Sequence, residues 1–302
     1  MIPSPTAPHR PALRYHGAKW RLAPWIISCI PAAHDSYIEP FGGSAAVLLR
    51  KSRSPIEVYN DLDGDVVAFF RMLRERPDDL IRAIYWTPFA HAEQQLSRQP
   101  TDDPLERARR LYARSYLTIS GPTAQWNSGW RRQKKMSRGR NGEGRMKPAP
   151  ASFMEVEHLY QIAERLRGVF IEQSDALELI RRYDNLRAVH YVDPPYVTAT
   201  RKRWVASAYQ HEMTDDHHRA LAAVLRDCRG MVILSGYNSP LYGELFSDWP
   251  RLERQARTNG NTAENATESL WLNPAAQAAL AAEQQRLAAA ALPLFTYQEA
   301  PR

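Results

Sequence analysis

The chain contains 302 residues, of which 44% are hydrophobic, and it carries a formal net charge of +7. This length predicts about two packed domains, and no apolar run approaches the ~20 residues that cross a bilayer. Because Cys29 and Cys228 are the only cysteines, neither a disulfide framework nor a cysteine-rich metal site is supported, and we expect a soluble cytoplasmic protein without a membrane partner.

Strand and helix patterns alternate in the first quarter of the chain. Residues 36–39 and 56–59 have strand character, and residues 45–51 and 65–76 have helical patterns. Alternation of this kind predicts an α/β fold with a mainly parallel sheet.

A glycine-containing turn follows the first predicted strand. In Glu39-Pro40-Phe41-Gly42-Gly43-Ser44 the glycines would let the backbone approach a ligand beside a helix N-terminus. The alternative, which such a segment taken by itself favours, is a tight strand-to-helix turn without a ligand. However, Asn60-Asp61 ends the next strand, 61 − 43 = 18 residues after Gly43, where an acid can bind ribose hydroxyls. A nucleoside-containing ligand is therefore indicated. The same spacing also occurs in NAD-binding proteins, so a dehydrogenase is an alternative function.

The alternation stops between about Arg76 and Ala151. A helical pattern covers 105–119, and a basic, glycine-containing stretch follows Trp126 and Trp130. Between Arg131 and Lys147, eight basic residues and one acid give 8 − 1 = +7, which equals the net charge of the whole chain. Basic and aromatic residues in this mixture are typical of a nucleic-acid interface, and the alternative is a solvated basic loop. We expect a second domain, inserted into the α/β fold.

The second half returns to strands and helices. Strands are predicted at 169–172, 188–192 and 231–235, with a helix capped by Thr214 between the last two. Segments 252–256 and 268–272 flank a polar turn and predict an antiparallel hairpin. Asn273-Pro274 would then start an alanine-rich helix that packs on the sheet or against another subunit.

Asp193-Pro194-Pro195-Tyr196 follows the predicted strand at 188–192. Prolines stiffen a loop and donate no amide hydrogen, so this loop offers acceptors. Asp193 and the Pro194 carbonyl can accept the two hydrogens of an exocyclic amine, and Tyr196 can stack on the ring that carries it. The alternative is a turn that closes a buried strand. His211, His217 and His218 lack a ligand pattern and are interpreted as solvated or structural residues.

Four motifs, in this order, resemble the Dam-like (D12 class) adenine-specific DNA methyltransferases in the alpha motif order: Tyr15-His16-Gly17-Ala18-Lys19, Glu39 to Ser44, Tyr59-Asn60-Asp61-Leu62-Asp63 and Asp193 to Tyr196. Ala45 stands where the last glycine of Phe-x-Gly-x-Gly is usual. The resemblance implies a Rossmann-like, mostly parallel sheet with a C-terminal antiparallel hairpin and an inserted, mainly helical target-recognition domain. It assigns 1–75 and 152–302 to the catalytic domain and 76–151 to target recognition.

The resemblance also implies roles for individual residues. S-adenosylmethionine, with S-adenosylhomocysteine as its product and without a metal, would be held by Tyr15, Lys19, Glu39, Phe41, Gly43, Asp61 and Asp175. The catalytic loop would be Asp193, Pro194, Pro195 and Tyr196, acting on an adenine flipped out of the duplex. Double-stranded DNA would be bound by Trp126, Trp130, Arg131, Arg132, Lys134, Lys135, Arg138 and Arg140.

The expected activity is site-specific methylation of adenine N6 in bacterial or phage DNA, as in restriction–modification. One alternative is methylation of another exocyclic amine, cytosine N4 or an RNA adenine, because the loop recognises an amine in a flat ring. Another is a non-catalytic DNA-binding protein of the same fold. A cytosine C5 methyltransferase is disfavoured because neither cysteine follows a proline. The oligomeric state, monomer or homodimer, stays open.

Overall fold

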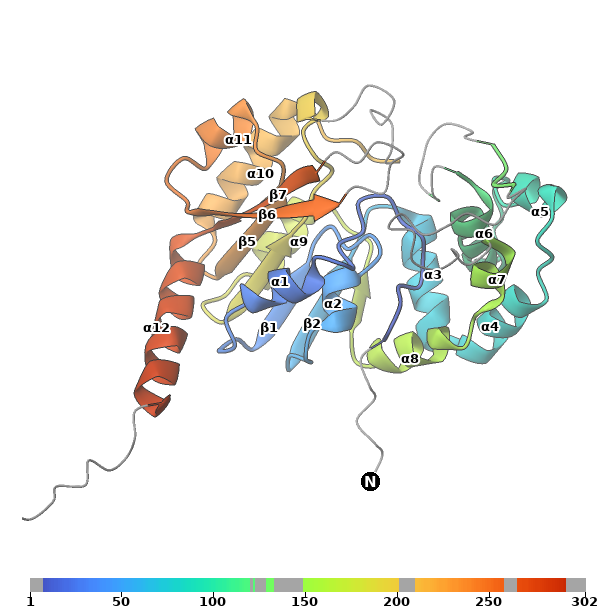
Figure 1. The fold of residues 1–302 in the computed structure, drawn as a ribbon, viewed down its shortest axis with the longest axis horizontal. Helices are drawn as coiled ribbons and strands as arrows, with labels where there is room; N and C mark the ends of the chain where they lie inside the picture. Colours follow the sequence, from blue (N-terminus) through green and yellow to red (C-terminus); the bar gives the residue numbers. More distant parts are fainter. Residues whose placement is uncertain are drawn as a thin grey trace, which may run out of the picture.

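The computed structural model describes residues 8–119, 122, 129–132, 149–200, 210–257 and 265–291. Within these residues, seven strands form one sheet in the order β3-β2-β1-β4-β5-β7-β6 (Figure 1). The strands are β1 (Ser36–Glu39), β2 (Ile56–Asn60), β3 (Phe170–Glu172), β4 (Ala188–Val192), β5 (Met231–Gly236), β6 (Arg251–Arg257) and β7 (Asn265–Leu272).

The first five strands are parallel. Ser36 of β1 is in register with Ile56 of β2 on one side and Ala188 of β4 on the other. Every residue of β1, β4 and β5 is buried, as expected for parallel strands covered on both faces. β7 runs antiparallel to both β5 and β6. The predicted α/β fold with a C-terminal hairpin is confirmed, and the hairpin strands are longer than predicted.

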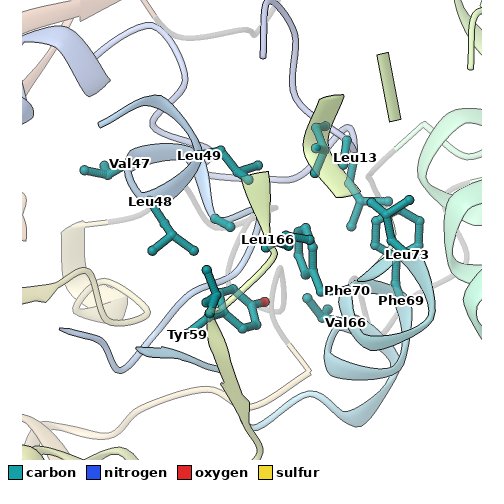
Figure 2. Packing of buried hydrophobic residues seen from close by; sticks show 14 of the residues in the cluster. Leu13, Val47, Leu48, Leu49, Tyr59, Val66, Phe69, Phe70, Leu73 and Leu166 are labelled. Carbon is teal, nitrogen blue, oxygen red and sulfur yellow. The ribbon is translucent and has the colours of Figure 1, made fainter. Parts of the chain in front are cut away.

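Helices cover both faces of the sheet (Figure 1). One face packs against α1 (Ala23–Ser28), α2 (Ala46–Arg50), α3 (Gly64–Glu75) and α12 (Pro274–Ala291). The other face packs against α9 (Ala176–Tyr183), α10 (Asp215–Asp227) and α11 (Pro240–Leu245), and a short 3-10 turn, η1 (Thr198–Thr200), follows β4. Figure 2 shows the first core, where Leu48 and Leu49 of α2 lie near Tyr59 of β2 and Phe70 of α3. No helix among the described residues is both long and apolar enough to cross a membrane.

A group of helices extends from α3 at one end of the sheet (Figure 1). It comprises α4 (Pro77–Tyr85), α5 (His91–Leu96), α6 (Pro104–Leu117), α7 (Ala149–Met154) and α8 (His158–Arg165). α6 packs along α3, and buried side chains such as Leu80 and Tyr112 belong to the same hydrophobic cluster as α2. The helices between β2 and β3 thus share a core with the sheet, and the domain boundaries at 75 and 152 stay a prediction.

Two predicted helix starts show how local sequence positions these elements. The Thr214 hydroxyl accepts a hydrogen bond from the His217 amide, and His217 Nδ1 accepts one from the Thr214 amide, which forms a capping box. Asn273 Oδ1 accepts from the Ala276 amide at the start of α12 and from the Val232 amide of β5. Asn273 therefore both caps the helix and ties it to the sheet.

Candidate active site

A cavity of about 550 Å³ opens at the carboxyl ends of the parallel strands. Its wall includes Glu39 at the end of β1, Asp61 after β2, Asp175 after β3 and Asp193 after β4. After β1, the chain adds β2 and β3 on one side of β1 and then β4 and β5 on the other side. The order in which strands are added to the sheet therefore reverses at β1. Ligands of open α/β sheets bind in the crevice outside the strand ends at such a reversal, and the volume is in the range of small-molecule sites.

The glycine turn forms one wall of this cavity. There is little room for a side chain at either glycine of the turn. A Cβ atom at Gly42 would overlap the ring of Tyr59. Gly43 has a φ of +47°, and its amide donates a 2.7 Å hydrogen bond to Asp61 Oδ2. The ring of Tyr15 packs 3.1 Å from the Cβ position of Gly43. The turn thus presents bare backbone to the cavity.

Ala45 and Glu39 together explain how α2 starts beside the turn. Ala45 has a φ of +54°, in the left-handed region that glycine prefers, and its side chain cannot cap the helix. Glu39 of β1 supplies the cap instead, since its Oε1 accepts a 2.6 Å hydrogen bond from the Leu48 amide and another from the Tyr37 hydroxyl. The Glu39 carboxyl is therefore both a helix cap and part of the cavity wall.

The cavity is rich in carboxyl groups. Among the described lining residues, Lys19 is the one lysine or arginine, and the acids are Glu39, Asp61, Asp63, Asp175, Asp193 and Glu212. Burial raises the pKa of Glu39 to about 7, although the bonds from Tyr37 and Leu48 oppose this shift. Burial likewise raises the pKa of Asp61 to about 6, against two backbone amide bonds. Such a cavity favours a ligand that carries positive charge.

Asp193 has one occupied and one free oxygen. Its Oδ2 lies 2.9 Å from the ammonium of Lys19, which also donates to the Gly17 carbonyl. Its Oδ1 is buried and has no hydrogen-bond partner among the described residues. A buried carboxylate oxygen without a partner costs free energy. Because Asp193 lines the cavity, this oxygen is the acceptor that a bound donor would satisfy.

Tyr196 is held from three sides. Its hydroxyl donates to the Glu268 carboxylate, which also accepts a 2.9 Å bond from the Ser235 hydroxyl. The Lys19 ammonium lies 4.7 Å from the centre of the Tyr196 ring, and the Tyr237 ring packs edge-on at 4.6 Å. Burial, then the charges of Asp193 and Glu268, raises the pKa of Tyr196 well above its usual range. Tyr196 therefore remains a neutral hydrogen-bond donor.

The structure brings all seven predicted cofactor residues to the wall of this one cavity, together with Asp193 and Pro195. Pro194 and Tyr196 are not among the described lining residues, and Tyr196 is 8% exposed. Asp175 also caps α9 by accepting from the Leu177 and Glu178 amides. The roles predicted for these residues stay predictions.

Three predicted DNA-binding residues, Trp130, Arg131 and Arg132, lie in the described part of the chain. Trp130 pairs with Thr118 at the end of α6 and stacks on His91, with ring centres 5.2 Å apart. Arg131 lies beside Arg14, since burial and then the charge of Arg131 lower the pKa of Arg14 to about 10. Arg132 is exposed. The predicted residues outside the described part of the chain are Trp126, Lys134, Lys135, Arg138 and Arg140.

Sequence reasoning missed several residues of the site. Glu268 of β7 connects Tyr196, Ser235 and Lys19, whose ammonium lies 3.9 Å from Glu268 Oε1. Because Asn265, Thr267 and Ser269 of the same strand are also polar, no local pattern marked Glu268. His211 and His217, interpreted from sequence as solvated or structural, line the cavity. His218 is buried, with its Nδ1 3.1 Å from the Tyr242 hydroxyl.

Comparison with known proteins gives two matches. Residues 15–259 match the family model of the D12 class N6 adenine-specific DNA methyltransferases. The chain is also similar to type II methyltransferase M1.LlaDCHI of Lactococcus lactis subsp. cremoris, with 24% identity over 278 residues that cover 83% of this chain and 89% of the relative. The matched region includes the glycine turn, Asp61 and the Asp193 loop.

Proposed function

The chain belongs to the D12 class N6 adenine-specific DNA methyltransferase family, and from this premise we propose that it transfers a methyl group from S-adenosylmethionine to N6 of an adenine flipped out of duplex DNA. The observation that carries the proposal is the free Oδ1 of Asp193, a buried acceptor on the wall of an acidic cavity. An exocyclic amine is a donor that matches it.

The residues of the cavity fit S-adenosylmethionine. This molecule supplies an electrophilic methyl group on a sulfonium sulfur, and it also carries an ammonium group and a ribose. The carboxyl of Glu39 suits the ammonium, and Asp61 retains lone pairs for the ribose hydroxyls although it accepts from Gly43 and Asp63. Two buried carboxyls with raised pKa values gain stability when a cation neutralises them.

Asp193 would prepare the amine for attack. The lone pair of an adenine amine is delocalised into the ring, so the nitrogen is a poor nucleophile. Hydrogen bonds from its two hydrogens to Asp193 Oδ1 and to the Pro194 carbonyl favour rehybridisation of that nitrogen. Lys19 holds the other Asp193 oxygen at 2.9 Å, which fixes the direction in which Oδ1 accepts. No covalent intermediate with the protein is needed.

Tyr196 would receive the flipped base, and Glu268 would position it. Flipping costs a few kcal/mol, and stacking on an aromatic ring offsets about 1–3 kcal/mol of that cost. The hydroxyl bond to Glu268 and the edge contact with Tyr237 keep the Tyr196 ring in one orientation. Since Tyr196 is 8% exposed, stacking of a base on its ring would require the side chains that cover it to move aside.

The basic region would hold the DNA backbone. Arg14 immediately precedes Tyr15 of the cavity wall, and it lies beside Arg131, the first residue of the basic stretch. Neither guanidinium forms an ion pair among the described residues, and Arg14 makes only long bonds of 3.3 and 3.4 Å to carbonyls of α6 and Thr118. A phosphate between two such guanidinium groups would remove their mutual repulsion.

The test is single-turnover methylation of duplex DNA by Asp193→Ala, with modified nucleosides identified by mass spectrometry. Loss of one hydrogen bond that strengthens in the transition state lowers the rate by about 100-fold or more, while binding of DNA and S-adenosylmethionine should persist. Asp227→Ala, an exposed acid of α10, is the matched control and should retain the wild-type rate. Methylation that survives Asp193→Ala would refute the assigned role.

The modified nucleoside in this assay, together with a measurement of S-adenosylmethionine binding, separates two of the alternatives. N4-methylcytosine in the product would show that cytosine, and not adenine, is the substrate. Failure to bind S-adenosylmethionine would indicate a non-catalytic DNA-binding protein. The relative from Lactococcus is named a type II methyltransferase, which supports a role for this chain in restriction–modification.

A further inference from the structure

A second cluster of chemically reactive side chains lies away from the cavity. Asp184 and Cys228 are the C-cap residues of α9 and α10, and His190 lies in the middle of β4 beneath them. One ligand atom from each side chain falls within 4.8 Å of the other two. None of the three residues lines the cavity, so the methyltransferase site does not explain why they are together.

His190 is the anomaly in this cluster. It is 0% exposed. Its Nε2 lies 3.4 Å from Asp184 Oδ1, a long contact within ion-pair distance of that carboxylate, and its Nδ1 is buried without a hydrogen bond among the described residues. Its register neighbours on the adjacent strands, Ile38 of β1 and Val232 of β5, offer no polar side chain. A fully buried imidazole whose one polar neighbour lies at 3.4 Å is poorly satisfied, which is costly unless a ligand binds it.

The surroundings favour a cation. α9 and α10 both end at the cluster, and helix C-termini carry partial negative charge. Metal binding needs the thiolate form of Cys228, so a bound cation would displace the thiol proton. A divalent ion that replaces this proton would meet one thiolate, one carboxylate and one neutral imidazole. The sum of charges is then 2 − 1 − 1 = 0, which suits a buried position.

We propose that Asp184, His190 and Cys228 form a binding site for a zinc-type divalent cation, with water as the fourth ligand. Sulfur, imidazole nitrogen and carboxylate oxygen are the donors that zinc takes in proteins. Tetrahedral bonds of about 2.0–2.3 Å place ligand atoms about 3.5 Å apart, so the observed atoms would need to approach by about 1 Å. Binding forms three bonds between the metal and the protein and one between the metal and water, and it releases one proton, from Cys228.

The existing bonds of these residues permit this change. Asp184 accepts from the Arg229 and Gly230 amides at 2.8 and 2.9 Å, one per oxygen, so each oxygen keeps a lone pair. The Cys228 thiol donates a 3.3 Å bond to the Val224 carbonyl, and this weak bond would be exchanged for the metal. Asp184 and Cys228 are only partly buried, which leaves a path for an ion to enter.

The test is Zn²⁺ binding to the full chain, measured by competition with a chromophoric chelator after removal of metals. Wild type and Cys29→Ser should each bind one Zn²⁺, and Cys228→Ser should bind it more than about 100-fold more weakly, since even loss of a partner outside the ligand set costs 10–100-fold. Co²⁺ should give a thiolate charge-transfer band in the near ultraviolet that Cys228→Ser removes. Cys29→Ser is the control for loss of a thiol elsewhere.

A second measurement needs no variant. Zn²⁺ should slow alkylation of Cys228 by iodoacetamide in the wild-type protein, with the rate at Cys29 as the internal reference. The proposal is overturned if the wild type binds no Zn²⁺, if Cys228→Ser binds it as tightly as the wild type, or if Zn²⁺ leaves the alkylation rate of Cys228 unchanged.

Discussion

Replacement of Lys19 by methionine should destabilise the protein far more than loss of an ordinary ion pair. Lys19 Nζ lies 2.9 Å from Asp193 Oδ2 and 3.9 Å from Glu268 Oε1. At an effective dielectric constant of about 20, these separations correspond to attractions of about 6 and about 4 kcal/mol. The cost of burying the ammonium offsets much of this gain, and removal of one partner of a buried pair destabilises a protein by about 3–5 kcal/mol.

The loss should depend on pH. Burial, with a further contribution from Asp193, already raises the pKa of Glu268, and Lys19 opposes that shift. Without Lys19, the pKa of Glu268 in the folded variant is higher still. The variant therefore loses stability as the pH rises from the unfolded pKa of Glu268 through its folded pKa. We therefore expect the smallest deficit near pH 4, where the carboxyl is protonated in both states, and the largest near pH 8.

Urea unfolding at several pH values measures this effect. Arg219→Met is the matched control, because Arg219 pairs with Glu244 at 2.7 Å on the surface and an exposed pair contributes about 1 kcal/mol or less. Lys19→Met combined with Glu268→Gln should recover about 1–3 kcal/mol at pH 8, because one of the two facing charges is gone. The reasoning is wrong if Lys19→Met costs no more than Arg219→Met, or if its cost is the same at pH 4 and pH 8.

Three further variants test the glycine turn and its surroundings. Ala45→Gly should stabilise the protein by about 0.5–1 kcal/mol in urea unfolding, because it relieves the strain of an alanine in the left-handed region. Ala46→Gly in α2 should destabilise the protein by a similar amount. Two shifts of the same sign would contradict this reasoning. Gly42→Ala should lower the free energy of unfolding by about 2 kcal/mol and abolish S-adenosylmethionine binding in calorimetry, since the added methyl overlaps the ring of Tyr59. The control, Gly243→Ala in α11, places its methyl in open space and should not weaken binding. Glu39→Gln should flatten the loss of wild-type stability between about pH 4.5 and 7, because the folded carboxyl has a pKa of about 7; an unchanged slope would show that this group does not titrate there.

Local sequence determined much of the architecture. The strands at 36–39 and 188–192 were predicted to the residue, because short segments rich in aromatic and β-branched residues and bounded by turn residues favour an extended backbone. Thr214 and Asn273 were correctly placed at helix starts, since a cap needs only a side-chain oxygen and the next few amides. The glycine turn and the Asp-Pro-Pro-Tyr loop could be found for the same reason: each is one continuous segment.

Only the tertiary structure decided which charges face one another. Lys19, Asp193 and Glu268 come from three distant parts of the chain, and they meet because β7 inserts between β5 and β6 while the N-terminal segment closes over the strand ends. No local pattern assigns Glu39 to cap α2 or places His190 between the ends of α9 and α10. Pairing energies and pKa shifts depend on distance and burial. The sequence alone therefore determined the strands, the turns and the types of side chain available, and the packing of the sheet decided which of them interact.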